Sequence, residues 1–146
     1  SSSFTEKGRH MTEHITLELL RSNPDTTHKS LRAPSRYGIE VVDLATFVGS
    51  PLFFARERFR VYENNAYTCV SCCATGTHVL FWSHDASGVH ADLIGLKDDR
   101  WTLFTKDHII PRFRGGSSQP ANLQTMCAAC NSAKATNNHV EGKQWA

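Results

Sequence analysis

Two Cys-x-x-Cys pairs constrain the fold of this chain more than any other feature of its sequence. The pairs are Cys69-Val70-Ser71-Cys72 and Cys127-Ala128-Ala129-Cys130. Each spacing lets a tight turn direct two thiolates at one tetrahedral zinc ion, and two such turns complete a closed structural site. Since 54 residues separate the pairs, other elements must lie between them. The sequence therefore predicts a structural zinc site made by Cys69, Cys72, Cys127 and Cys130.

The number of cysteines argues against a disulfide framework. There are five, an odd number, and the first residues contain no apolar signal-peptide core. The fifth, Cys73, is adjacent to Cys72 and could replace it as the ligand. A redox pair is the other interpretation of a single Cys-x-x-Cys motif, but two pairs without a βαβ pattern disfavour it.

Length and composition indicate one soluble globular domain, or a small domain with an extension. The chain has 146 residues, of which 40% are hydrophobic and 21% charged. It contains no apolar run near the roughly 20 residues that cross a bilayer, so we expect no membrane association and a cytoplasmic location. Residues 1–10 resemble a tag or cloning leader, with the natural start expected at Met11. We assign 11–49 to a partly helical N-terminal extension and 50–146 to the main domain.

Charge is distributed unevenly along the chain. The formal net charge is +2, but residues 51–62 carry +2, residues 63–99 carry −4 and residues 100–146 carry +4. Concentrated basic charge can steer a polyanion to one face of a protein. Scattered, solvated charges are the alternative interpretation.

Helices are expected in the first half of the chain and at its end. Thr12 can cap a short helix over 12–21, and 22–38 has loop composition. Residues 39–48 fit a strand or a helix equally well. Ser50 as N-cap and Pro51 at the first helical position predict a helix over 52–62, ended by Glu63-Asn64-Asn65. Its buried face would contain Leu52, Ala55, Phe59 and Tyr62.

Strands are expected between the cysteine pairs. Residues 79–82 and 89–94 are two expected strands, and a third is 101–105, which has the β-branched and aromatic bias of a strand. A short strand follows at 122–126, and a helix is expected to begin near the second cysteine pair. These elements predict an α+β fold.

The most informative motif begins at the end of the third predicted strand. It consists of Asp107-His108-Ile109-Ile110-Pro111, Gly115-Gly116, Asn122-Leu123-Gln124, Cys127-Ala128-Ala129-Cys130-Asn131 and Lys134. Asn122 lies 14 positions after His108 in the sequence, and Asn131 lies nine positions after Asn122. This order and spacing resembles the HNH endonuclease family over residues 52–137. The resemblance implies a ββα-metal core stabilised by the four-cysteine zinc site.

His108 is the candidate general base. Hydrolysis of a phosphodiester needs an activated water, and an imidazole with a pKa near neutrality can take its proton. A single histidine in a strand is more often packed or surface-exposed, so this assignment depends on the surrounding motif.

Asp107 and Asn131 are the candidate ligands of a catalytic ion. Adjacent side chains alternate across a strand, so Asp107 and His108 should point to opposite faces. The resemblance implies that both nevertheless reach one cleft, where Asp107 and Asn131 supply oxygen ligands to Mg²⁺ or Mn²⁺. It also implies that Asn122 braces the loop and orients His108. The alternative for Asn131 is a helix cap.

Other residues have weaker assignments. Arg112, Arg114 and Lys134 are candidate phosphate contacts, with simple exposure as the alternative for Lys134. Gly115-Gly116 indicates a turn and could let the backbone approach a phosphate. A second metal site would need His78, His84, His90 and Asp92, whose spacing fits no known template.

The sequence therefore predicts a metal-dependent endonuclease that hydrolyses DNA, with double-stranded DNA as the expected partner. The resemblance implies 5′-phosphate and 3′-hydroxyl products and a bacterial or phage origin. Two alternatives remain: a catalytically inactive, zinc-stabilised nucleic-acid-binding module, and a zinc-dependent protein whose basic face binds another protein.

Overall fold

Helices and one antiparallel sheet make up the part of the chain that the structure describes. The computed structural model describes residues 39–82 and 90–145. The predicted helix over 12–21 and the loop over 22–38 lie outside these residues. In chain order the elements are β1 (Ile39–Asp43), α2 (Leu44–Val48), α3 (Pro51–Phe54), α4 (Glu57–Asn64), β2 (His78–Trp82), β3 (His90–Lys97), β4 (Arg100–His108), the 3-10 turns η2 (Arg112–Arg114) and η3 (Pro120–Asn122), β5 (Leu123–Cys127) and α5 (Ala128–Trp145).

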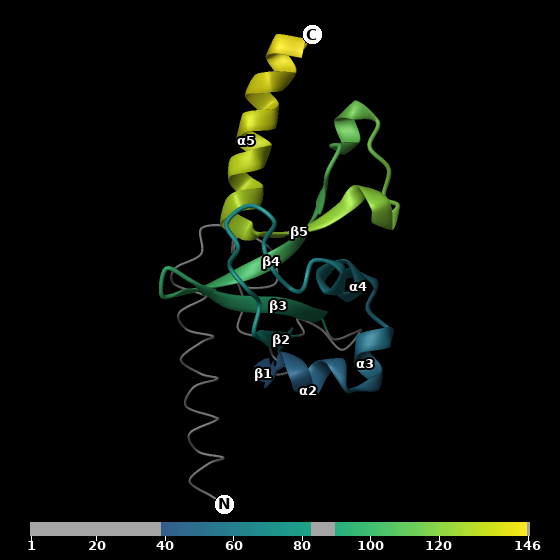
Figure 1. The fold of residues 1–146 in the computed structure, drawn as a ribbon, viewed down its shortest axis with the longest axis vertical. Helices are drawn as coiled ribbons and strands as arrows, with labels where there is room; N and C mark the ends of the chain where they lie inside the picture. The colour runs from purple at the N-terminus through teal and green to yellow at the C-terminus, as the bar shows by residue number, and fades with distance from the viewer. Residues whose placement is uncertain (1–38, 83–89, 146) are drawn as a thin grey trace, which may run out of the picture.

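The sheet has the strand order β1-β2-β3-β4-β5, and every neighbouring pair is antiparallel. The long strand β4 changes partner along its length. It pairs with β3 through Arg100–Leu103 and with β5 through Phe104–His108. The loop after β4 and helix α5 extend from the same end of this sheet (Figure 1). This mixture of helices with an antiparallel sheet agrees with the predicted α+β class.

Both alternatives for residues 39–48 are present, one after the other. The first five residues form β1, which pairs with β2, and the next five form α2. The change occurs where the Leu44 N–H donates to the Thr77 carbonyl. The change from strand to helix directs the Phe47 side chain into the core, where it is almost completely buried.

The single helix predicted over 52–62 is wrong, because the chain forms two helices separated at Ala55 and Arg56. In a continuous helix Phe53 and Phe59 would lie about 120° apart around the axis. The break lets both rings enter the core, while Leu52 stays 49% exposed. Ala55, also predicted to be buried, is exposed. The predicted end is confirmed, since α4 finishes at Asn64.

The other predicted elements are confirmed with small shifts of their ends. Strands β2 to β5 overlap the four predicted segments. Both β3 and β4 extend three residues beyond their predicted ends, β4 as far as His108, and Val89 lies outside the described residues. Helix α5 starts at Ala128, within the second cysteine pair. Within the described ranges, no helix combines the length and apolar character needed to cross a membrane.

An aromatic core fixes the helices against β4 and β5. The rings of Phe47 and Phe59 lie 4.6 Å apart, and Phe59 contacts Tyr62 edge to face. The buried Tyr62 hydroxyl donates to the Phe104 carbonyl at 3.2 Å. Because Phe104 is paired with Cys127, this core also supports the strand that leads into the second cysteine pair.

Candidate active site and metal centre

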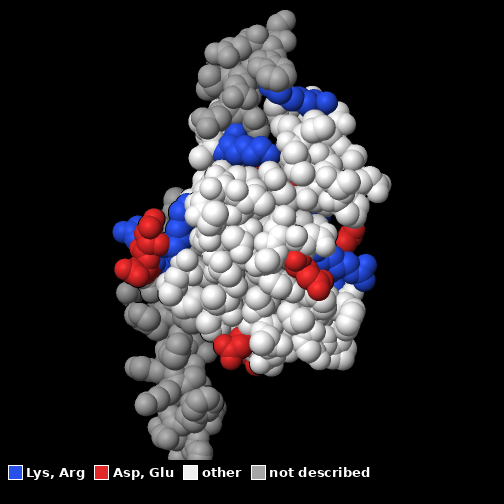
Figure 2. Space-filling model, in the orientation of Figure 1, with Lys and Arg blue, Asp and Glu red and all other residues white. Residues whose placement is uncertain are grey.

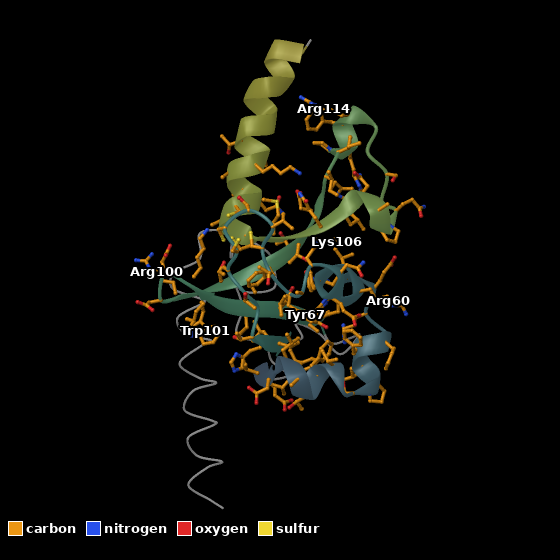
Figure 3. The ribbon with its side chains drawn as sticks, viewed as in Figure 1. Arg60, Tyr67, Arg100, Trp101, Lys106 and Arg114 are labelled. Atoms are coloured by element: carbon orange, nitrogen blue, oxygen red, sulfur yellow. The ribbon has the colours of Figure 1, made fainter. Side chains whose placement is uncertain are left out.

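The two cysteine pairs meet in space as their spacing predicts. The Sγ atoms of Cys69, Cys72, Cys127 and Cys130 all lie within 4.8 Å of one another, and none forms a disulfide. A tetrahedral ion with metal–sulfur distances of about 2.3 Å needs sulfurs about 3.8 Å apart. The Cys72–Cys127 separation is 3.8 Å. The cluster, visible as yellow sulfur atoms near the base of α5 (Figure 3), can hold a metal such as zinc.

The first pair reaches the second by docking on the open edge of β5. The Val70 N–H donates to the Thr125 carbonyl at 3.0 Å, and the Thr125 N–H donates to the Asn65 side-chain oxygen at 2.9 Å. These two bonds occupy polar groups of an edge strand. They also place Cys69 beside Cys127, which closes the long gap between the pairs. Cys73 lies outside the four-sulfur group, so Cys72 is the residue in the ligand position.

The surroundings of the cluster shift the pKa values of its thiols in opposite directions. Burial raises the pKa of Cys69, but backbone N–H groups of Cys72, Cys127 and Ser71 outweigh it and lower that pKa to about 7. Burial raises the pKa of Cys127 to about 12. Lys97 donates from Nζ to the sulfurs of Cys127 and Cys130 at 3.6 and 3.5 Å. Sequence reasoning missed Lys97, because only the sheet brings it to the cluster.

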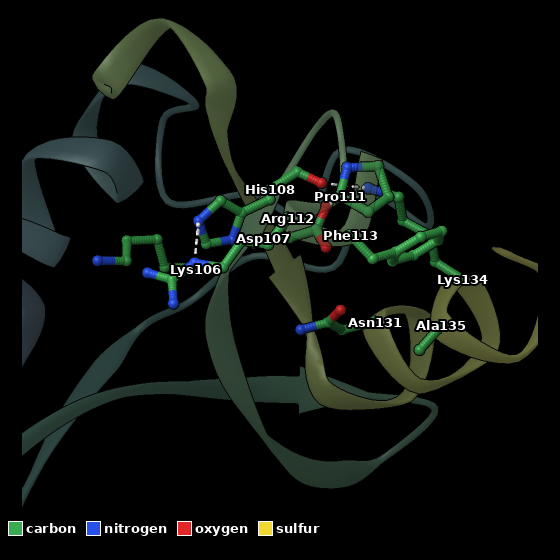
Figure 4. Close-up of a pocket in the computed structure, with 9 residues that line it drawn as sticks. All are labelled: Lys106, Asp107, His108, Pro111, Arg112, Phe113, Asn131, Lys134 and Ala135. Carbon is green, nitrogen blue, oxygen red and sulfur yellow. Dashed lines mark hydrogen bonds and ion pairs between the residues drawn. The ribbon is translucent and has the colours of Figure 1, made fainter. Parts of the chain in front are cut away.

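A pocket of about 360 Å³ lies where β4 ends beside α5. It contains three of the four predicted catalytic residues, Asp107, His108 and Asn131. Strand β4 supplies the first two, α5 supplies Asn131, and Arg112 with Phe113 covers another side from the loop (Figure 4). Its full lining is Lys106, Asp107, His108, Pro111, Arg112, Phe113, Asn131, Lys134 and Ala135.

Asp107 is buried, with 8% of its surface exposed. Its Oδ2 accepts hydrogen bonds from Gln124 Nε2 at 2.9 Å and from Lys134 Nζ at 2.6 Å. Gln124 lies directly opposite Asp107 in the β4–β5 register. The carboxylate is therefore held by donors from both β5 and α5.

His108 points to the other side of the strand end, as alternation along a strand requires (Figure 4). Its Nε2 lies 3.1 Å from Ser118 Oγ and 3.4 Å from Arg112 Nε. A guanidinium can only donate, so Nε2 accepts this bond and carries a lone pair. The nitrogen that can take a proton thus faces the loop side of the pocket.

Asn131 is in the first turn of α5, inside the helix, and does not act as its cap. Its Nδ2 donates to Thr105 Oγ1 at 2.8 Å, and Thr105 Oγ1 in turn donates to the Met126 carbonyl at 3.0 Å. These two hydrogen bonds fix the orientation of the Asn131 amide. In Figure 4 the amide oxygen points toward Asp107. Thr105, two residues before Asp107 on the same strand face, was not predicted.

Asn122 lies outside the pocket lining and braces the loop. Its Oδ1 accepts from the Ile110 N–H at 2.8 Å, and its Nδ2 donates to the carbonyls of Ile110 and Ser117 at 3.1 and 2.7 Å. The glycines complete the turn: Gly115 has φ +84°, and a Cβ at Gly116 would collide with the Ile110 carbonyl. Their presence is thus explained by the turn itself.

The predicted phosphate contacts have different surroundings. Arg112 is exposed and also donates to Ser118 Oγ at 3.1 Å. Arg114 lies on the loop beside α5 (Figure 3), stacked at 5.7 Å on the neighbouring Phe113 ring. The Lys134 ammonium points inward. Figure 2 shows basic residues at the end of the molecule formed by this loop and α5, while acidic residues lie at mid-height, beside further basic residues, and at the opposite end.

The second metal site considered from sequence is not assembled. His78 contacts Thr77 and the Asp43 carboxylate, whereas Asp92 pairs with Arg58 at 2.9 Å. Among the residues that the structure describes, the four cysteines are the only group of three or more His, Cys, Asp or Glu side chains arranged to hold a metal. His84 lies outside those residues.

Comparison with known proteins gives a family match over the part of the chain that contains the motif. Residues 96–141 match the family model described as HNH endonuclease, which confirms the resemblance seen in the sequence. The match contains Asp107, His108, Asn122, Asn131 and the second cysteine pair. Searches of curated proteins and of solved structures found no match.

Proposed function

We propose that this chain, an HNH endonuclease family member over residues 96–141, is a metal-dependent endonuclease with a ββα-metal core formed by β4, β5 and α5. The observation that carries the proposal is the single pocket shared by Asp107, His108 and Asn131. The family implies a nucleic-acid substrate, and we propose double-stranded DNA, cut to 5′-phosphate and 3′-hydroxyl ends.

His108 acts as the general base. Its Nε2 lone pair takes a proton from the attacking water once Arg112 and Ser118 release it. The Arg112 guanidinium carries several donors, so it can exchange this hydrogen bond for one to a phosphate oxygen. Binding of the substrate would then free the base.

Asp107 and the Asn131 amide oxygen hold the catalytic ion. A carboxylate and an amide oxygen suit a hard cation such as Mg²⁺ or Mn²⁺, with water and phosphate completing its shell. When bound, such an ion supplies charge stabilisation for the phosphate and the departing oxygen. The Thr105 hydrogen bond keeps the Asn131 oxygen turned toward this position.

The four cysteines hold zinc in a structural role. Soft thiolates favour zinc, whereas the oxygen ligands of the pocket favour Mg²⁺, so the two sites select different metals. Four thiolates and one Zn²⁺ carry a formal charge of −2, which Lys97 partly offsets. Affinity for DNA consequently depends on the local basic surface with Arg112 and Arg114 and should fall with salt.

A plasmid-cleavage assay tests the proposal. Protein with a verified zinc content is dialysed free of other divalent ions and incubated with DNA, with and without added Mg²⁺ or Mn²⁺. We expect nicked or linear product only with the added ion, and ends that DNA ligase can rejoin. Binding in a gel shift without cleavage would favour the inactive module, and absence of both would favour the protein-binding alternative.

A further inference from the structure

One oxygen of the Asp107 carboxylate is occupied by two donors from different elements. Gln124 from β5 and Lys134 from α5 both donate to Oδ2, at 2.9 and 2.6 Å. The Asp107 side chain is 10% exposed and that of Lys134 is 23% exposed, so the ion pair is largely shielded from water. Such a pair fixes the carboxylate more firmly than a surface ion pair would.

Lys134 is already surrounded by acceptors. Besides Asp107, its Nζ lies 2.7 Å from the His108 carbonyl and 3.4 Å from the Ile109 carbonyl. An ammonium group has three protons, and these three oxygens can use all of them. Before the divalent ion binds, a phosphate contact by Lys134 would leave the buried Asp107 carboxylate without its counter-charge, which is unfavourable. The geometry therefore disfavours the phosphate contact expected from sequence.

We propose that Lys134 and Gln124 are positioning residues: they hold Asp107 by Oδ2 and leave Oδ1 as its single ligand atom for the divalent ion. The proposal rests on the proposed function, because it assigns Asp107 to that ion. Lys134 also donates to the backbone carbonyls of His108 and Ile109. These bonds fix the backbone at the end of β4, so the general base and the metal ligand keep the same relative position. Gln124 contributes from the directly opposite position on β5.

Two kinds of measurement separate positioning from phosphate binding. Each cationic phosphate contact adds about one unit to the slope of log affinity against log salt. Lys134→Met should leave this slope at the wild-type value, whereas Arg112→Met should reduce it by about one. At saturating Mn²⁺, Lys134→Met should cleave at least tenfold more slowly, because the carboxylate is no longer fixed. Direct Mn²⁺ binding, measured from the EPR signal of free Mn²⁺, should be no weaker, since a nearby positive charge has been removed.

Gln124→Leu provides the second variant, because it removes one donor to the same oxygen without changing any charge. It should also lower the rate at saturating Mn²⁺ and keep the salt slope. Arg100→Met removes a positive charge from an exposed position outside the pocket, so it is the control and should keep the wild-type rate and salt slope. Zinc content and thermal unfolding verify that each variant is folded.

The outcomes are distinct. A slope reduced by one unit in Lys134→Met would make it a phosphate contact and overturn the proposal. Unchanged cleavage rates in both Lys134→Met and Gln124→Leu would overturn it as well. If wild-type protein neither bound Mn²⁺ nor cut DNA, the proposed function would fail instead, and the salt slope would still decide whether Lys134 contacts phosphate.

Discussion

Cys130 and Asn131 are consecutive residues in the first turn of α5, yet Cys130 joins the sulfur cluster while Asn131 lines the pocket. The cluster and the candidate active site are therefore coupled through one turn of helix. Fixing Cys130 fixes the start of α5, and with it the amide that we assign to the catalytic ion. Zinc would thus contribute to activity through position alone.

Removing a zinc ligand should destabilise the whole protein. Cys127→Ser should reduce zinc well below one ion per chain and lower Tm by roughly 10 °C or more, because the binding energy of a structural zinc is folding energy. Metal analysis and calorimetry measure both effects. Cys73→Ser is the matched control and should keep wild-type values, since Cys73 lies outside the cluster. Equal effects in the two variants would contradict the assignment of Cys72 over Cys73.

Lys97 should slow the loss of zinc. Its ammonium donates to two of the four sulfurs, which offsets the excess negative charge of a zinc tetrathiolate. Outer-shell partners of this kind change metal affinity by about 10- to 100-fold. Lys97→Met should therefore release zinc to a chromogenic chelator at least about tenfold faster than wild type. The exposed Lys106→Met should release it at the wild-type rate, and equal rates in all three proteins would remove this role from Lys97.

Loss of the oxygen ligands should affect only the catalytic ion. Asp107→Ala and Asn131→Ala should each lower cleavage by about a hundredfold or more, as expected for groups that act on the transition state. Zinc should stay at one ion per chain, because thiolates hold it. Added Mg²⁺ should restore Asn131→Ala more than Asp107→Ala, which loses a charge. A Mg²⁺ titration of cleavage rates, paired with zinc analysis, checks this. Full activity of both variants would contradict the assignment of Asp107 and Asn131 as ligands of the catalytic ion.

The buried hydroxyl of Tyr62 should make stability sensitive to alkaline pH. Burial raises the pKa of Tyr62, so the folded protein keeps the phenol proton while the unfolded chain begins to lose it near pH 10. This stabilising contribution is complete below that pH and is lost as pH rises. Tyr62→Phe should cost about 1 kcal/mol at pH 7 through the lost bond to Phe104, with a smaller difference at pH 10.5. Urea unfolding at both pH values measures it; a difference that grows with pH would contradict this account.

Local sequence patterns could predict those parts of the site whose geometry is set by neighbours in the chain. The Cys-x-x-Cys spacing predicts which sulfurs can meet, because each pair needs only one turn. The strand ending in Asp107-His108 is similarly visible from its β-branched and aromatic residues. Asn122 could be assigned to the loop by family resemblance, and its three hydrogen bonds to Ile110 and Ser117 are consistent with that role.

The parts that were missed depend on register and tertiary packing. Gln124 meets Asp107 only because β4 and β5 pair in one particular register, and Lys97 reaches the sulfurs only through the β3–β4 hairpin. The break at Ala55 and Arg56 has a similar cause. A helical pattern with Leu52 on its buried face is locally acceptable, but burial of Phe53 together with Phe59 is favoured in the folded chain.

The central claim is that the pocket at the end of β4 hydrolyses phosphodiesters with His108 as the base. Single-turnover cleavage of plasmid DNA at saturating Mg²⁺ tests it most directly, comparing wild type with His108→Ala and with His78→Ala as a histidine control outside the pocket. We expect His108→Ala to lose about a hundredfold or more in rate, while zinc content, DNA affinity and the activity of His78→Ala stay near wild type. Near-normal cleavage by His108→Ala would contradict it.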